Sequence, residues 1–221
     1  MDFSWDLIWK SAPFLLQGAW LTVKLTTISV AIGFIIGTFA GMARIARTPL
    51  LRTTAAVYID FIRGTPLLVQ IFLVYMGLPQ FIGQPISPTM AGLAALSLNA
   101  GAYIAEIVRA GIQSIDRGQT EAARSLGMNY RLTMWHIVLP QAFKRIIPPL
   151  GNEFIAMLKD SSLVSVISME ELVRKGQLII GRTFRPFEIW ISVALLYLVM
   201  TIIISRLVAY SEKKLKVQTP M

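Results

Sequence analysis

Cysteine is absent from the 221 residues of this chain, so a disulfide framework and a thiolate metal site are both excluded. The single histidine, His136, excludes a multi-histidine metal site and a conventional serine–histidine–aspartate triad. Charged residues make up only 15% of the chain, fewer than in a soluble domain of this size. Without an evident pair of nucleophile and base, the composition argues against an enzyme.

Apolar residues dominate what is present: they account for 55% of the chain, and the mean hydropathy is +0.62. These values are typical of an integral membrane protein. The net charge of +9 agrees with the excess of Lys and Arg found in the cytoplasmic loops of membrane proteins. Nucleic acid is not an expected partner, because the apolar runs leave little room for a basic surface patch.

Five segments are long and apolar enough to cross a bilayer, which takes about 20 mostly apolar residues. They are residues 20–43, 55–77, 88–108, 146–167 and 187–209. The fourth is the least hydrophobic, because it contains Glu153, Lys159 and Asp160. The pattern predicts an all-α integral membrane protein with five transmembrane helices and one domain over residues 1–221.

The N-terminus is acidic, which argues against a cleaved signal peptide. Residues 1–18 favour an amphipathic helix that lies at the membrane surface. Thirteen of the 21 Lys and Arg residues lie on one side of the predicted spans, in the loops 44–54 and 109–145 and in the tail from residue 206, against five on the other side. The positive-inside rule then places the N-terminus outside and the C-terminus in the cytoplasm.

Glycines recur every four residues on the first span, at Gly33, Gly37 and Gly41. This spacing puts three small residues on one helix face and lets another helix approach closely. We favour packing within the chain over a contact between subunits.

The longest cytoplasmic connection, residues 110–135, contains a short helix pattern. Residues 120–126 are good helix formers, and Gly127 is a natural C-terminal cap. Glu121 is expected in the first turn, where a carboxylate interacts favourably with the helix dipole.

This short helix has a surface suited to a partner. Ala122 and Ala123 have little bulk, so a partner could sit close, and Leu126 would be its apolar anchor. The alternative is an ordinary amphipathic connector.

Three blocks of sequence carry a resemblance to a known family. The first is F-I-R-G-T-P-L-L-V-Q at residues 61–70. The second runs from N-A-G-A-Y at residues 99–103 through E-A-A-x-x-x-G at 121–127, with I-V-L-P nine residues later. The third combines P-P-L-G-N-E-F at 148–154 with L-K-D-S-S-L at 158–163. The chain resembles the permease subunits of polar amino acid ABC importers, the histidine, glutamine and arginine group.

The resemblance implies the type I ABC importer fold and a set of partners. A second permease chain, identical or paralogous, would face this one. An ATP-binding cassette subunit would hold the E-A-A helix, the coupling helix, through Glu121, Ala122, Ala123, Leu126 and Gly127. ATP and Mg would be bound by that subunit and no cofactor by this chain, which lacks a G-x-x-x-x-G-K-[ST] phosphate loop. An extracytoplasmic amino acid binding protein would deliver the polar amino acid substrate, and membrane lipid would surround the spans.

Ionisable side chains inside a span are costly and should face a cavity or a partner. Glu153 and Asp160 are seven residues apart, so they share one helix face, with Met157 between them. The P-P-L-G run at residues 148–151 should weaken the helix just before Glu153, and transporters often place substrate sites at broken helices.

We expect Glu153 to bind a substrate ammonium or guanidinium group, with Met157 beside it. Asp160 would bind a second positive group, or pair with Lys159 or Arg63. The alternative is that both carboxylates serve internal ion pairs.

Other polar residues in the spans have two interpretations. Asn99, midway along the third span, could contact substrate or tie this span to a neighbouring helix, because a buried amide needs partners. Thr22, Thr26 and Ser29 could line the path, but we favour hydrogen bonds from their hydroxyls back to helix carbonyls. Pro66 should kink the second span.

Two groups of charges outside the predicted site have simpler interpretations. Glu106 and Arg109, at i and i+3, are expected to form an ion pair on one helix face. The E-E-L-V-R-K run at residues 170–175 predicts a solvated outside helix with matched charge.

One competing function is an ion-coupled secondary amino acid transporter without an ATPase partner, in which the membrane carboxylates bind the coupling ion. It predicts transport driven by an ion gradient alone.

Overall fold

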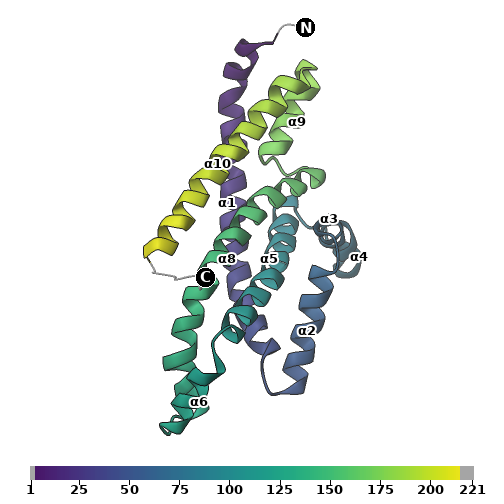
Figure 1. Cartoon of the computed structure of the whole chain (residues 1–221). Helices are drawn as coiled ribbons and strands as arrows, with labels where there is room; N and C mark the ends of the chain where they lie inside the picture. Colours follow the sequence, from purple (N-terminus) through teal and green to yellow (C-terminus); the bar gives the residue numbers. More distant parts are fainter. Residues whose placement is uncertain (1–2, 215–221) are drawn as a thin grey trace.

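The structure, a computed structural model, describes residues 3–214, and the elements within this range are all helical. In chain order they are α1 (Trp5–Arg44), α2 (Pro49–Arg63), α3 (Leu67–Phe72), the π-helix η1 (Leu73–Gly77), α4 (Leu78–Ile82), α5 (Pro88–Gln113), α6 (Arg117–Ser125), α7 (Tyr130–Thr133), the π-helix η2 (Met134–Val138), α8 (Leu139–Asp160), the 3₁₀-helix η3 (Ser161–Ile167), α9 (Leu172–Thr183) and α10 (Pro186–Lys214). The all-α prediction is confirmed. Figure 1 shows α1, α5 and α8 running side by side, with α6 at one end of the molecule and α9 at the other.

Three described helices, α1, α5 and α10, are long and apolar enough to cross a membrane, and a fourth span results if α2 and the α3–α4 segment count as one. They contain the predicted spans 20–43, 88–108 and 187–209. The predicted fourth span, residues 146–167, does not pass the same test. It consists of the end of α8 and the whole of η3, and its charged residues lower its hydropathy.

The first helix is longer than predicted. α1 runs without interruption for 40 residues, and the Ser4 hydroxyl caps it by accepting from the Leu7 N–H. The prediction of a separate surface helix over residues 1–18 is wrong for its described part, because residues 5–18 are the first turns of α1. At 1.5 Å per residue α1 is about 60 Å long, twice the hydrocarbon thickness of a bilayer.

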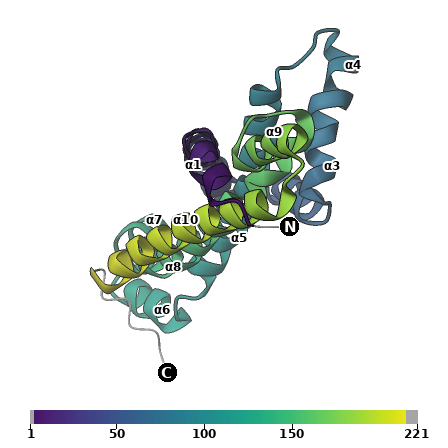
Figure 2. The same ribbon diagram turned by 90° about the horizontal axis from the view of Figure 1, so that it is seen from above.

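The predicted second span, residues 55–77, is not one helix. α2 and α3 meet at an angle of 105° across the G-T-P sequence at residues 64–66. Pro66 has no N–H to donate and its ring obstructs the preceding turn, which explains why the helix ends there. The predicted kink is therefore a full break, and it projects α3 and α4 away from the side of the molecule that carries α6 (Figure 2).

A second expected break does not occur. α8 continues through Pro148 and Pro149, and the helix changes only at Ser161, where the 3₁₀ segment η3 begins. Neighbouring helices can support a proline-containing helix in membrane proteins, and α8 packs against α5, α1 and α10.

The main packing interface joins α1 to α5. Ideal Cβ atoms built on Gly33, Gly37 and Gly41 would lie within 2.7 Å of atoms of α5. The glycine stripe therefore serves a contact inside the chain, as predicted.

Replacing Gly37 with alanine should destabilise this interface. The new Cβ would lie 2.7 Å from the Gly101 carbonyl oxygen, a backbone atom that cannot rotate away. Overpacking of this kind costs about 1–3 kcal/mol, so the melting temperature in detergent should fall. Gly181→Ala in α9 is the matched control, because no described atom beyond its own turns of the helix lies within 4 Å of its added Cβ. A melting temperature unchanged by Gly37→Ala would contradict the interface.

The junction of α1, α9 and α10 contains a buried carboxylate. Glu171 is 0% exposed and caps α9, accepting from the N–H groups of Val173 and Arg174 at 2.9 Å each. The Tyr197 hydroxyl donates to the same carboxylate at 3.2 Å, and the Thr22 hydroxyl lies 3.5 Å away. Burial raises the pKa of Glu171, and these hydrogen bonds oppose the rise.

The prediction of a solvated, charge-matched helix is therefore wrong for Glu171 and holds for Glu170. The Glu170 carboxylate is largely exposed and pairs with the Lys175 ammonium at 2.8 Å. This hydrogen bond lowers the pKa of Glu170.

Glu171→Ala should reduce stability by about 1–3 kcal/mol, because it leaves two backbone N–H groups and a buried tyrosine hydroxyl without their acceptor. The adjacent Glu170→Ala should cost less than about 1 kcal/mol, as expected for an exposed ion pair. Thermal unfolding of both variants in detergent compares them. Equal destabilisation would mean that the buried cluster does not hold the junction.

Candidate functional site

A cavity of about 310 Å³ lies where the α2–α3 break, α5, α8 and η3 meet. It is lined by Thr65, Pro66, Leu67, Asn99, Tyr103, Glu153, Ala156, Asp160 and Leu163. Three of the predicted substrate residues, Asn99, Glu153 and Asp160, are thus brought to one cavity.

The two carboxylates of the cavity have no counter-ion in contact with them. Glu153 is half-buried and Asp160 is exposed, and the two lie two turns apart on α8. Within residues 3–214, neither forms an ion pair or a side-chain hydrogen bond. The suggested pairing of Asp160 with Arg63 is wrong, since Arg63 instead lies 3.9 Å from the Glu106 carboxylate and 5.3 Å from the centre of the Tyr103 ring.

Asn99 both lines the cavity and ties two helices together. Its side-chain amide nitrogen donates to the side-chain oxygen Oε1 of Gln70 at 2.9 Å. Gln70 in turn donates to the carbonyl oxygens of Ile62, at 2.7 Å, and Thr65, at 3.0 Å. These two carbonyls belong to the helix break, so Gln70 satisfies backbone groups that the break leaves free. Gln70 is not among the predicted site residues, although a glutamine inside the apolar run 67–72 is itself a signal of a buried polar contact.

Met157 does not join the cavity. It is 1% exposed and belongs to the apolar core, a cluster that also includes residues of α5 and η3. The structure therefore contradicts the placement of Met157 in the substrate site, although the i, i+4, i+7 spacing puts it on the same face of α8 as the carboxylates.

Two of the three predicted hydroxyl groups on α1, those of Thr22 and Thr26, bond back to helix carbonyls as favoured, whereas the buried Ser29 hydroxyl has no hydrogen-bond partner within the described residues. Thr22 donates to the Gly18 carbonyl at 3.0 Å, and Thr26 donates to the Thr22 carbonyl at 2.9 Å. Both side chains are fully buried between helices, so they do not line the cavity.

A charged strip continues from the cavity along α5. Arg109 donates to Glu106 through Nε at 2.9 Å, which confirms the predicted i, i+3 pair. The Glu106 carboxylate thus interacts with both Arg109 and Arg63, so its charge is compensated, in contrast to the charges of Glu153 and Asp160.

The short helix of the long connection is α6, and its ends are well defined. The Asp116 carboxylate caps its start by accepting from the Gly118 N–H at 2.6 Å. At its end, Gly127 adopts φ +83° and donates to the Arg124 carbonyl, while the Met128 N–H reaches the Ala123 carbonyl at 3.1 Å. This pair of bonds is a Schellman motif, so the predicted cap at Gly127 is confirmed.

The surface of α6 differs in two respects from the prediction. Glu121 is the fifth residue of α6, beyond the first turn, because the Asp116 cap starts the helix three residues earlier than predicted. Ala123 is buried at 4% exposure and packs inward, so it does not present a face to a partner. Ala122 is exposed, and Leu126 is 83% exposed, which leaves a small apolar surface at the tip of the molecule.

Known proteins with similar sequences are transport system permeases. Residues 30–217 match the family model described as the binding-protein-dependent transport system inner membrane component. The chain is 40% identical to the glutamine transport system permease protein GlnP of Escherichia coli (strain K12), over 98% of this chain and all of that protein. It is 39% identical to the arginine transport system permease protein ArtQ of Bacillus subtilis (strain 168), over 98% of each.

Solved structures of ABC transporters have the same fold as this chain. A chain in the crystal structure of an amino acid ABC transporter with histidines superposes with a TM-score of 0.93 at 45% identity, covering 97% of this chain and all of that one. The fold also matches a chain of the methionine transporter MetNI in an inward-facing form, with a TM-score of 0.80 at 19% identity and coverage of 97% and 100%. The protein belongs to the family of binding-protein-dependent transport system inner membrane components, and it has the fold of ABC importer permeases.

Proposed function

We propose that this chain is the transmembrane subunit of an ATP-driven ABC importer that takes up a polar, basic amino acid by alternating access. Family membership and the permease names of its relatives support the transport role. They also argue against the ion-coupled alternative and against an enzyme, since hydrolysis in such importers belongs to a separate subunit.

The proposal of a basic substrate rests on the cavity that contains Glu153 and Asp160, two carboxylates without an ion-pair partner within residues 3–214. A carboxylate kept half-buried without a counter-ion is unfavourable, and a cationic ligand relieves that cost. Glu153 would hold one positive group and Asp160 a second. The side-chain oxygen of Asn99, which accepts no hydrogen bond from the described residues, would accept one from the substrate ammonium, since the amide nitrogen already donates to Gln70.

The remaining parts of the assembly follow from this function. A single permease domain over residues 1–221 would cross the cytoplasmic (inner) membrane of a bacterium five times, with its N-terminus outside and its C-terminus in the cytoplasm. A second permease chain would complete the path, and an extracytoplasmic binding protein would deliver the amino acid. ATP and Mg would bind to the cassette subunit that grips α6.

Competition for uptake tests the substrate class. In proteoliposomes containing the importer and its binding protein, unlabelled arginine, lysine and histidine should each suppress uptake of labelled arginine, and glutamine should do so much less. Preferential competition by glutamine would contradict the basic substrate, and uptake that requires an ion gradient but not ATP would contradict the importer itself.

A further inference from the structure

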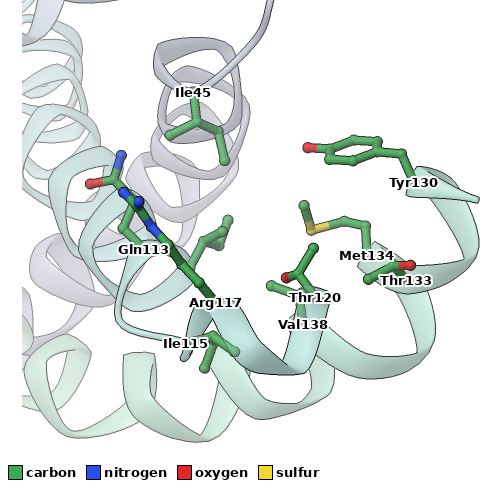
Figure 3. Close-up of a pocket in the computed structure, with 10 residues that line it drawn as sticks. Ile45, Gln113, Ile115, Arg117, Thr120, Tyr130, Thr133, Met134 and Val138 are labelled. Atoms are coloured by element: carbon green, nitrogen blue, oxygen red, sulfur yellow. The ribbon is translucent and has the colours of Figure 1, made fainter. Parts of the chain in front are cut away.

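A second cavity, of about 480 Å³, lies between α6 and the ends of α1 and α5, and we call it the α6 cavity. Figure 3 shows side chains from α5, α6, α7 and η2 surrounding it, together with Ile45, the residue after α1, and Ile115, from the connection between α5 and α6. It shares no lining residue with the cavity that contains Glu153. Its volume falls in the range of about 300–1,000 Å³ typical of small-molecule sites.

The α6 cavity has an apolar wall and a polar edge. Ile45, Ile115 and Met134 supply much of the wall. Arg117 and Gln113 supply the edge, and in Figure 3 the Arg117 side chain extends from α6 toward the end of α5. An apolar body with one polar group matches this arrangement.

The charge around the α6 cavity is positive. Arg117 forms no hydrogen bond or ion pair within the described residues 3–214. On the other side, the Arg47 guanidinium lies 5.3 Å from the centre of the Tyr130 ring, which itself lines the cavity. None of the lining residues is acidic. The carboxylate of the neighbouring Asp116 accepts a hydrogen bond from the Gly118 N–H and caps α6.

We infer that the α6 cavity binds a small amphiphilic anion. Its apolar body would pack against Ile45 and Met134, and its carboxylate or phosphate would accept hydrogen bonds from Arg117. A guanidinium group suits either anion, because its parallel N–H groups match two oxygens at once. A soluble organic acid and an acidic lipid both have this chemistry.

Occupancy has a mechanical consequence, which rests on the proposed coupling role of α6. A bound molecule would bridge α6 to α1 and α5, and would restrict the movement of α6 against them. Substrate-stimulated ATP hydrolysis should therefore fall when the cavity is filled.

Binding is tested on the full-length chain purified with its ATP-binding subunit in nanodiscs of phosphatidylcholine. Calorimetric titration with phenylbutyrate should show saturable binding, whereas phenylbutylamine, with the same body and the opposite charge, should bind about tenfold more weakly or not at all. Arg117→Gln should weaken phenylbutyrate binding about tenfold or more. Arg52→Gln, an exposed arginine of α2 outside the cavity, should leave it unchanged.

A cavity-filling variant provides the second measurement. Thr120→Trp places a ring where Thr120 now lines the space, and it should abolish phenylbutyrate binding. If this variant does not assemble, Arg117→Gln and the amine comparison decide alone. Absence of binding, equal binding of acid and amine, or binding that is insensitive to Arg117→Gln would each overturn the inference.

Lipid composition distinguishes the two sources of the anion. If phosphatidylglycerol in the nanodiscs weakens phenylbutyrate binding, and Arg117→Gln removes that difference, the natural occupant is an acidic lipid. If affinity is the same in both lipids, the occupant is a soluble acid. Loss of ATPase stimulation at saturating phenylbutyrate then tests the mechanical consequence, and its failure would contradict the coupling role of α6 without affecting the binding site.

Discussion

Glu153→Gln should reduce arginine uptake by about 10- to 150-fold. The substitution keeps the shape of the side chain and removes the charge that would hold a substrate ammonium or guanidinium group. A hydrogen bond to a charged group contributes about 1.5–3 kcal/mol, which corresponds to that range of rates when the contact is lost. Glu153 has no ion pair within residues 3–214, so the change should leave no cation of the chain without its partner.

The measurement is uptake of labelled arginine into proteoliposomes, with ATPase activity recorded in parallel. Asp6→Asn is the matched control, because this carboxylate is 73% exposed and, within residues 3–214, forms its one ion pair with Lys10 on the same helix face. Basal ATP hydrolysis should persist in Glu153→Gln, while its stimulation by substrate should be lost. Uptake within a factor of about two of the unmodified importer would remove Glu153 from the substrate site.

Ala122→Trp should separate the chain from its ATP-binding subunit. Ala122 is an exposed small residue of α6, and a bulky ring there would prevent a close-fitting partner from approaching. Leu126→Ala should weaken the same contact by about 1.5–3 kcal/mol, the value of burying a leucine side chain. Both variants should retain the fold, because both side chains point away from the core.

Co-purification of the ATP-binding subunit, quantified at several protein concentrations, checks this prediction. Thr53→Trp on α2 is the control for the introduction of an exposed tryptophan. Ala123 is a poor choice for the same experiment, because it is buried and a larger residue would disturb α6 itself. Undiminished retention of the subunit by both Ala122→Trp and Leu126→Ala would show that α6 is not the docking element.

The sequence alone was sufficient for features that depend on composition or on neighbours a few residues apart. The apolar runs indicated a membrane protein, because spanning segments need about 20 apolar residues. The stop of α6 at Gly127 and the Glu106–Arg109 pair were predictable for the same reason, since a left-handed cap and an i, i+3 contact are local. The spacing of Gly33, Gly37 and Gly41 also predicts a close contact with another helix, although it does not identify α5 as that helix.

Tertiary contacts decided what local spacing could not. Glu171 lies in a charged run whose pattern predicts exposure to solvent, yet it is buried. The hydroxyls of Thr22 and Tyr197, which lie 149 and 26 residues away in the sequence, form hydrogen bonds with its carboxylate. Met157 shares a helix face with Glu153 and Asp160, but it is buried in the apolar core, whereas the two carboxylates line the cavity. The proline pair at 148–149 is held inside a continuous α8, whereas Pro66 ends a helix and produces a bend of 105°. In each case the free energy of burying the side chain or of keeping the helix intact depends on which distant helix supplies a hydrogen bond or an apolar surface. That partner is determined only by the packing of the helices.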